Sequence, residues 1–330
     1  MHIGQRVPTF ADPADRGLDM QASRAYRQAA WLSATLARRC AVRFITLAIV
    51  AGAAGCASPY LLTVEDVVCP VGKKAKLIGK LEYRGLAVWN KGIEDRDLDF
   101  SLDGRLVGHD DTNDDGYANV KLRLASPGVR RLEVRYTDRR GGVHTAASSV
   151  FVWDADDPVL IVDIDQTVSD TKKRYLLGDG VDRSKPLPGA VQVLGELADR
   201  FHVVYLTARP REMAVKTLRW LNDQGFPRGP VLCWDIDEYE FSATEYKKDR
   251  LDDLEDRLDH VNLGVGNAES DHTAYRKRKL FTILVDPHEP PARIERGVRL
   301  PDWAAVRRLF ATNPHLYDRD LSYKTVVRWP

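Results

Sequence analysis

The sequence predicts two folded domains of different classes: an all-β sandwich, followed by an α/β domain with a parallel sheet flanked by helices. Residues 57–157 alternate apolar and polar side chains with a period of two, as strands with one buried face do. Residues 158–290 alternate continuous apolar runs with helical patterns, which is typical of a parallel sheet. A length of 330 residues suits two domains with additional segments. We therefore also expect an N-terminal segment, 1–56, and a tail, 291–330, that packs on the α/β domain.

Composition excludes several classes of protein. The chain has 49 Lys and Arg against 48 Asp and Glu, whereas a generic nucleic-acid binder usually has a strongly basic domain. Four cysteines are too few for a disulfide-dense scaffold. No run reaches about 18 uninterrupted apolar residues, which excludes a polytopic membrane protein. We expect a folded globular protein with no nucleic-acid partner.

The N-terminal segment has the features of an export signal. Basic residues up to Arg43 precede a run of apolar and small residues at 44–55, a pattern that is typical of a secretory signal. Residues 53–56 resemble a bacterial lipobox, whose cysteine is lipidated and becomes the mature N-terminus. The resemblance implies a lipoprotein exported from the bacterial cytoplasm and anchored through Cys56 to a membrane surface, in the periplasm or at the cell surface. A plain cleaved signal and an uncleaved anchor are the alternatives.

The first folded domain shows its strands through alternation. Apolar and charged residues alternate at 120–124 and again at 132–136, and the Asp-Gly pair at 103–104 predicts a hairpin turn. The stretch 79–136 resembles bacterial immunoglobulin-like (Ig-like) domains, which implies a spacer or binding domain. Residues 111–116 match the first half of an EF-hand calcium loop, but the twelfth position is Leu122 instead of Glu, so we expect a solvated turn.

Polar side chains follow the strands predicted in the second domain. The apolar run 159–162 leads directly into Asp163 and Asp165, and the strand predicted at 201–206 leads into Thr207. Two carboxylates this close repel each other unless a cation or an anion-transfer reaction stabilises them. Ligands of open α/β sheets bind at this carboxyl edge. The sequence therefore predicts a chemical site here, with an acidic loop as the alternative.

The remaining elements of the second domain continue the alternation. Strands are predicted at 231–234, 260–265 and 281–285, and helices at 190–198, 213–221 and 246–258. Asn267 and Asp271 again place polar groups after a strand.

The polar residues at the predicted strand ends form four groups along the chain that together resemble a known set of motifs. The groups are, in order, Asp163, Asp165 and Thr167; Thr207; Lys247; and Asn267 with Asp271. This order resembles the four motifs of the haloacid dehalogenase (HAD) superfamily. Within that superfamily, 205–209, 246–254 and 266–276 are similar to the catalytic domain of lipins, the LNS2 family of phosphatidate phosphatases. The resemblance implies a Rossmann-like HAD fold.

The resemblance also implies a role for each residue. Asp163 would attack phosphorus to form an aspartyl-phosphate, and Asp165 would act as general acid and base. Thr207 and Lys247 would bind phosphoryl oxygens, with Lys248 as the alternative to Lys247.

The same resemblance implies ligands for a metal ion and for the substrate. Mg²⁺ would be held by the Asp163 carboxylate, the Asp165 carbonyl and Asn267, with Asp271 orienting this shell or joining it through water. The substrate-binding residues would be Thr167 and Arg209, although a structural ion pair is the alternative for Arg209.

Little room is left for a cap over the site. Segments 168–186 and 209–247 hold few residues beyond the predicted elements, so the site should be open with a minimal cap. An open site on a lipid-anchored protein favours a phosphate on a large or membrane-bound molecule, such as phosphatidate. The basic residues 276–279 would meet anionic head groups, unless they form a solvated helix face.

The sequence therefore predicts an Mg²⁺-dependent phosphomonoester hydrolase. A phospholipid-binding module with little or no turnover is one alternative, although Asp163 and Asp165 are both present, which argues against it. A phosphatase acting on nucleic-acid ends or phosphoproteins is the other.

Overall fold

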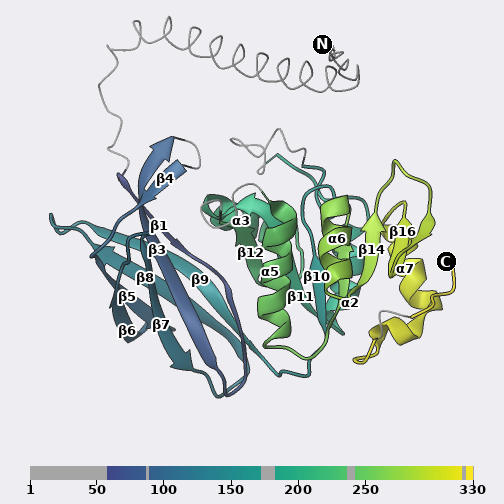
Figure 1. The fold of residues 1–330 in the computed structure, drawn as a ribbon, viewed down its shortest axis with the longest axis horizontal. Helices are drawn as coiled ribbons and strands as arrows, with labels where there is room; N and C mark the ends of the chain where they lie inside the picture. Colours follow the sequence, from purple (N-terminus) through teal and green to yellow (C-terminus); the bar gives the residue numbers. More distant parts are fainter. Residues whose placement is uncertain (1–57, 87–88, 172–182, 236–241, 322–324, 330) are drawn as a thin grey trace, which may run out of the picture. The chain divides into compact units, whose positions relative to one another are not determined.

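A computed structural model describes the chain over residues 58–86, 89–171, 183–235, 242–321 and 325–329 (Figure 1). Pro59–Pro330 forms one compact unit. The predicted export segment and Cys56 lie outside the described residues. Within the described part, no helix is long and apolar enough to cross a membrane.

The first half of this unit is built from two packed sheets. One sheet has the order β1-β3-β4, with β7 also paired to β3; the other has the order β2-β9-β8-β5-β6. Their strands are β1 (Tyr60–Val64), β2 (Val67–Pro70), β3 (Lys74–Leu86), β4 (Trp89–Gly92), β5 (Asp97–Leu102), β6 (Arg105–Asp111), β7 (Tyr117–Arg123), β8 (Gly128–Thr137) and β9 (Val143–Trp153). Leu77, Leu98 and Leu132 are fully buried in the core between the sheets.

Two local predictions in this half can be followed in the structure. Along β8, Leu132, Val134 and Tyr136 are buried and alternate with more exposed neighbours. Asp103 and Gly104 join β5 to β6 with φ values of 50° and 79°, the positive values that a two-residue type I′ turn requires.

The second half is a seven-stranded sheet with the order β12-β11-β10-β13-β14-β16-β15, parallel except for β15. Its strands are β10 (Val159–Val162), β11 (His202–Pro210), β12 (Val231–Trp234), β13 (Val261–Gly266), β14 (Phe281–Val285), β15 (Ala292–Ile294) and β16 (Gly297–Leu300). The α-helices are α2 (Ala190–Ala198), α3 (Ala214–Asp223), α5 (Ala243–Glu255), α6 (Glu269–Lys277) and α7 (Trp303–Thr312), with 3₁₀ turns η2 (Arg211–Met213) and η3 (Pro314–Tyr317).

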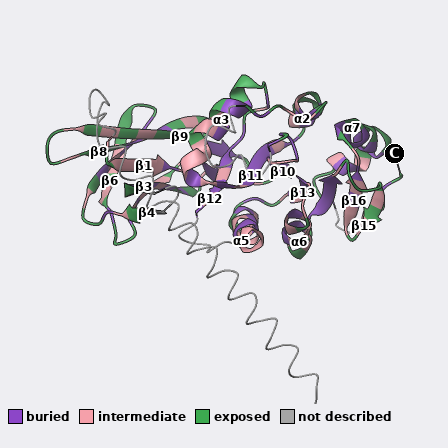
Figure 2. Cartoon of the chain, turned by 90° about the horizontal axis from the view of Figure 1, so that it is seen from above, coloured by how far each residue is buried: buried purple, intermediate pink, exposed green. Residues whose placement is uncertain are grey.

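Helices cover both faces of this sheet (Figure 2). Leu160 and Val162 of the central strand β10 pack in the core formed with α2, α3 and α7. The alternate residues of β10, Val159 and Ile161, pack in the core formed with α5 and α6. An α/β domain with a parallel sheet flanked by helices is therefore present.

The tail contributes more to this domain than the sequence predicted. Within 291–330, β16 pairs in parallel with β14, so the tail supplies strands of the sheet as well as the amphipathic helix α7. Buried and half-buried residues alternate in β16, so it lacks the continuous apolar run that predicted the equally short β10 and β12.

Candidate active site

The loop that follows β10 forms a tight turn next to Asp163. The carbonyl oxygen of Ile164 accepts hydrogen bonds from the N–H groups of residues 167–169. This turn brings the Thr167 hydroxyl to Asp163, where it donates to Oδ2 over 2.9 Å. The indole Nε1 of Trp303, in the tail, donates to the Thr167 carbonyl over 2.8 Å and so holds the loop in place.

A buried lysine joins two carboxylates at this edge. Lys247 Nζ donates to Asp163 Oδ1 over 2.6 Å and to Asp271 Oδ1 over 2.5 Å. The second oxygen of Asp271 accepts the N–H groups of Asn267 and Ala268, both over 3.0 Å, so this carboxylate also caps the first turn of α6. All three charged side chains are at most 8% exposed. The structure therefore brings Asp163, Thr167, Lys247 and Asp271 into direct contact.

A glycine makes this close approach possible. A Cβ atom added to Gly266, the last residue of β13, would lie 2.6 Å from Cβ of Asp271. Any larger residue would push the start of α6, and with it the Asp271 carboxylate, away from Lys247.

Burial governs the protonation of this cluster. Burial raises the pKa of Asp163 to about 7, because the attraction of Lys247 offsets only part of the desolvation and Asp271 and Asp165 repel the ionised form. Burial alone would lower the pKa of Lys247, but Asp163 and Asp271 outweigh it and hold that pKa above its usual range. The ammonium group therefore stays charged.

Asp165 belongs to a second ion pair at the same edge. Arg209 Nη2 lies 2.7 Å from Asp165 Oδ1, and Arg209 Nε lies 3.0 Å from Oδ2. Arg209 is fully buried and also donates to the hydroxyls of Thr171 and Thr217. This is the ion pair that the sequence left as the alternative to a contact between Arg209 and substrate.

The other predicted residues flank β10 on its two neighbouring strands. Thr207 is buried near the end of β11, where its hydroxyl oxygen accepts the N–H of Arg209 over 3.2 Å. Asn267 follows β13, and both strands pair with β10 at Val162. Lys248, the alternative to Lys247, instead pairs with Glu245 and Asp249 on the surface of α5.

The donor set at this edge suits Mg²⁺. The Asp163 carboxylate, the Asp165 carbonyl and the Asn267 side chain supply the hard oxygen ligands that this ion prefers. Once Asp163 is ionised, Asp163, Asp165 and Asp271 carry one more charge than Lys247 and Arg209 balance, which favours an added cation. One oxygen of Asp271 already accepts from Lys247 and the other accepts from backbone N–H groups. Asp271 would therefore orient the metal-binding residues through these contacts.

A compact group of three His, Cys, Asp or Glu side chains occurs elsewhere in the described residues. It consists of Asp97, Asp99 and His109, whose ligand atoms lie within 4.8 Å of one another on β5 and β6. Asp99 also accepts hydrogen bonds from Arg135, at 2.9 Å for the shorter. This group is part of the sandwich and is separate from the predicted site.

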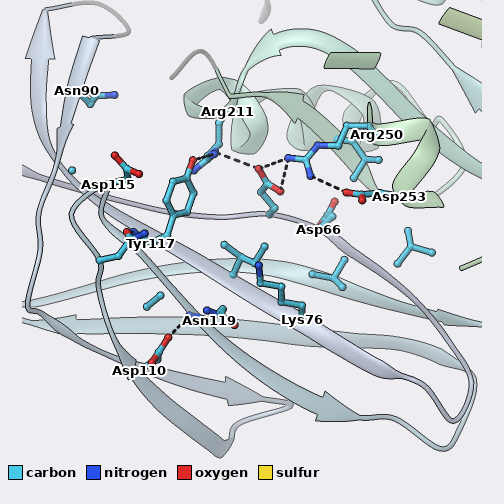
Figure 3. Close-up of a pocket in the computed structure, with 18 of the residues that line it drawn as sticks. Asp66, Lys76, Asn90, Asp110, Asp115, Tyr117, Asn119, Arg211, Arg250 and Asp253 are labelled. Carbon is cyan, nitrogen blue, oxygen red and sulfur yellow. Dashed lines mark hydrogen bonds and ion pairs between the residues drawn. The ribbon is translucent and has the colours of Figure 1, made fainter. Parts of the chain in front are cut away.

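The structure also contains a cavity of about 980 Å³ between the sandwich and α5, lined by none of the predicted catalytic residues (Figure 3). The acidic turn 111–116 contributes to its wall. Asn113 Oδ1 accepts the N–H of Tyr117 and closes that turn locally, in agreement with a turn rather than half of an EF-hand.

Trp303, Thr171 and Thr217 were missed at the sequence level. Trp303 offered a weak indication, since it opens the amphipathic stretch of the tail and a buried indole N–H usually needs an acceptor. The two threonines gave none, because only the folded chain brings them to Arg209.

A comparison with protein-family models gives a match that lies in the α/β domain. Residues 160–283, less than half of the chain, match the family model described as "PITM 1-3, LNS2 domain". No curated protein matches the chain.

Solved structures give only distant likenesses. The fibronectin(III)-like modules of Clostridium thermocellum CbhA are 15% identical, with 28% of this chain and 96% of that chain covered and a TM-score of 0.22. The Pnkp1/Rnl/Hen1 RNA repair complex is 19% identical, with 39% and 42% covered and a TM-score of 0.35. The N-terminal Ig1-2 module of the Drosophila receptor protein tyrosine phosphatase DLAR is 12% identical, with 32% and 60% covered and a TM-score of 0.24. At these TM-scores, none establishes a function for this chain.

Proposed function

We propose that the chain is a HAD-type, Mg²⁺-dependent phosphomonoester hydrolase that acts on a phospholipid monoester such as phosphatidate. The observation that carries the proposal is the buried cluster of Asp163, Lys247 and Asp271 at the carboxyl edge of the sheet. A carboxylate held at the end of a central strand beside a fixed ammonium group is arranged to meet a phosphoryl group. The LNS2 match over 160–283 supports the same class of chemistry.

The reaction would proceed in two steps on Asp163. A carboxylate oxygen attacks phosphorus, the bond from phosphorus to the alcohol oxygen breaks, and the alcohol leaves with a proton from Asp165. Water then attacks the aspartyl-phosphate, Asp165 takes its proton, and inorganic phosphate leaves with Asp163 restored. Lys247 and Thr207 would hold phosphoryl oxygens, and bound Mg²⁺ would offset charge on the carboxylate and the phosphate.

The ion pair with Arg209 sets a condition for this role of Asp165. In the structure both carboxylate oxygens of Asp165 face Arg209. Proton transfer therefore requires a protonated Asp165 and a loosened contact with Arg209 when substrate is present.

A second candidate is a phospholipid-binding module with little turnover. It is favoured by the hydrogen bonds on Asp163, since Lys247 and Thr167 each occupy one oxygen of the proposed nucleophile. Such a module would bind phosphatidate vesicles without releasing phosphate. In both cases we propose export and anchoring through Cys56, which would hold the protein at a membrane surface.

The test is phosphate release by the full chain from phosphatidate in detergent micelles and from an aryl phosphate, with Mg²⁺ or with EDTA. We expect Mg²⁺-dependent turnover that falls at least about 10³-fold in Asp163→Asn. Asp99→Asn is the matched control, because it removes a carboxylate from the sandwich group and should leave turnover unchanged. Preference for phosphatidate over the aryl phosphate tests the lipid assignment.

Absence of turnover on a panel that also contains phosphopeptides and phosphorylated nucleic-acid ends would reject the hydrolase. Retained binding to phosphatidate vesicles by the same protein would then establish the binding module. A distinct preference for one of the other substrates would keep the phosphatase and reject the lipid substrate.

A further inference from the structure

A second buried charge cluster joins the sandwich to the α/β domain. It contains three cations and three carboxylates, with every side chain at most 17% exposed: Lys80, Arg211, Arg250, Glu65, Glu82 and Asp235. Tyr117 of β7 adds its hydroxyl, which contacts Asp235 and accepts from Arg211 over 3.0 Å. Figure 3 shows Tyr117, Arg211 and Arg250 gathered where the two halves meet.

Glu65 is the link of this cluster on the sandwich side. It lies between β1 and β2, where the chain passes from one sheet of the sandwich to the other. Its carboxylate lies 3.4 Å from Arg211 Nε and 3.2 Å from Arg250 Nη2. One side chain therefore bridges two segments of the α/β domain.

Those two segments also carry the proposed phosphate-binding residues. Arg211 opens the 3₁₀ turn η2 directly after β11, the strand that contains Thr207. Arg250 lies on α5 about one turn beyond Lys247. In each of these two segments, one side chain belongs to the proposed phosphate site and another pairs with Glu65.

Further contacts from the sandwich hold the same parts of the α/β domain. Asn90 of β4 donates to Glu212 of η2 over 2.9 Å. Lys80 of β3 lies 3.5 Å from Asp235, directly after β12, and Asp235 in turn pairs with Arg211 of η2. Phe151 and Trp153 of β9 share a hydrophobic core with Tyr246, the neighbour of Lys247.

We propose that the sandwich positions the phosphate-binding residues of the α/β domain, with Glu65 as the central positioning residue. Buried ion pairs have defined geometry and are costly to separate, because each freed charge would remain desolvated. Through Arg211 and Arg250, Glu65 fixes the spacing between η2 and α5. That spacing sets the separation of Thr207 and Lys247 across a bound phosphoryl group.

The inference has a readout that does not depend on turnover. Glu65→Gln keeps the size of the side chain and removes its charge. In the full chain, we expect backbone hydrogen exchange to rise about tenfold in β11–η2 and in α5 together, since local opening no longer has to break the ion pairs. Glu133→Gln is the matched control, because Glu133 forms an exposed pair with Arg131 on β8, and its exchange pattern should equal that of the wild type.

The kinetic readout rests on the proposed function. A misplacement of about 1 Å remote from the chemistry can cost about 10²-fold in rate. We expect kcat for an aryl phosphate to fall between about tenfold and 10²-fold in Glu65→Gln, with weaker inhibition by inorganic phosphate. Glu65→Asp, which keeps the charge on a shorter arm, should recover part of both the exchange protection and kcat.

Two results would overturn the inference. One is unchanged exchange in both segments of Glu65→Gln, and the other is an equal rise over the whole domain, which would indicate only lower global stability. If Glu65→Gln does not fold, Glu65→Asp decides in the same way through its exchange pattern. If the wild type has no turnover, the proposed function fails, while hydrogen exchange still tests the positioning role of Glu65.

Discussion

The two buried charge clusters of this protein differ in their balance. At the candidate site, three carboxylates face two cations: Asp163, Asp165 and Asp271 against Lys247 and Arg209. At the interface between the sandwich and the α/β domain, three carboxylates face three cations. Burying an unbalanced charge is costly, and a balanced set avoids most of that cost. Once Asp163 is ionised, the excess negative charge lies where we propose that a cation and a phosphate bind.

Both clusters contain groups whose pKa is shifted by burial and by their neighbours. Asp163 has a pKa raised to about 7 because desolvation exceeds the stabilisation that Lys247 provides. Arg211, in the balanced cluster, keeps its charge: burial alone would lower its pKa, but neighbours beginning with Glu65 raise it overall. Burial also raises the pKa of Glu82 in that cluster, so the two clusters differ in charge balance and not in whether a carboxyl pKa is raised.

The largest effect should come from removing one cation from each cluster. Lys247→Met leaves Asp163 and Asp271 buried without their shared ammonium group. Arg211→Met leaves Glu65 paired with Arg250 and Asp235 paired with Lys80, so each of these carboxylates keeps a cation. We expect Lys247→Met to lower the free energy of unfolding by about 3–5 kcal/mol and Arg211→Met to lower it by less, measured by urea denaturation.

Mg²⁺ distinguishes these two variants. If the site carries an unmatched negative charge that holds a metal ion, millimolar Mg²⁺ should restore part of the lost stability in Lys247→Met and none in Arg211→Met. Equal responses of the two variants would remove the distinction between the clusters. Glu133→Gln again serves as a surface control, with an expected change below about 1 kcal/mol.

A smaller effect is expected from pH through Asp66, which lies next to Glu65. Its oxygens accept the N–H groups of Ser149 and Val231, and burial raises its pKa from 3.8 to about 6. The folded protein therefore binds this proton more tightly than the unfolded chain does. The contribution of Asp66 is largest below pH 4 and is lost as the pH rises through 6, by about 3 kcal/mol in total.

Asp66→Asn isolates this contribution. The variant lacks the titration, so its stability relative to the wild type should improve by about 3 kcal/mol between pH 4 and pH 7. The loss of one carboxylate acceptor adds an offset that does not change with pH. Urea denaturation of both proteins across this range measures the difference, and parallel curves would show that Asp66 has an ordinary pKa.

The sequence predicted local features of the site and missed the contacts that join distant segments. Asp163 and Asp165 follow a continuous apolar run, and this pattern correctly placed them at the end of a buried strand. Lys80 and Glu82 alternate with the buried Leu81, which shows only that they lie on the opposite face of β3. Alternation cannot tell whether solvent or another domain covers that face.

The same limit applies to Arg209 and to the tail. A lone arginine after a strand is compatible with substrate contact or with an ion pair, and only the folded chain brings its guanidinium to the Asp165 carboxylate. In the tail, Gly297 and Arg299 interrupt the apolar residues of β16, so no continuous run marks this strand, and its place in the sheet is known from its pairing with β14. The export segment, the metal ion and the lipid substrate stay predictions.

The smallest of these effects tests whether the tail supports the site and not the interface. Trp303→Phe removes the indole N–H that the Thr167 carbonyl accepts, while most of the buried aromatic surface is kept. An unsatisfied buried carbonyl should cost about 2 kcal/mol in urea denaturation. Because the Thr167 hydroxyl donates to Asp163, displacement of this loop should also lower kcat of the proposed reaction. Hydrogen exchange in η2 and α5 should stay at the wild-type level, since Glu65 still pairs with Arg211 and Arg250. Increased exchange in those segments would instead show that the two clusters respond as one unit, and the contrast between a reactive edge and an independent scaffold would then fail.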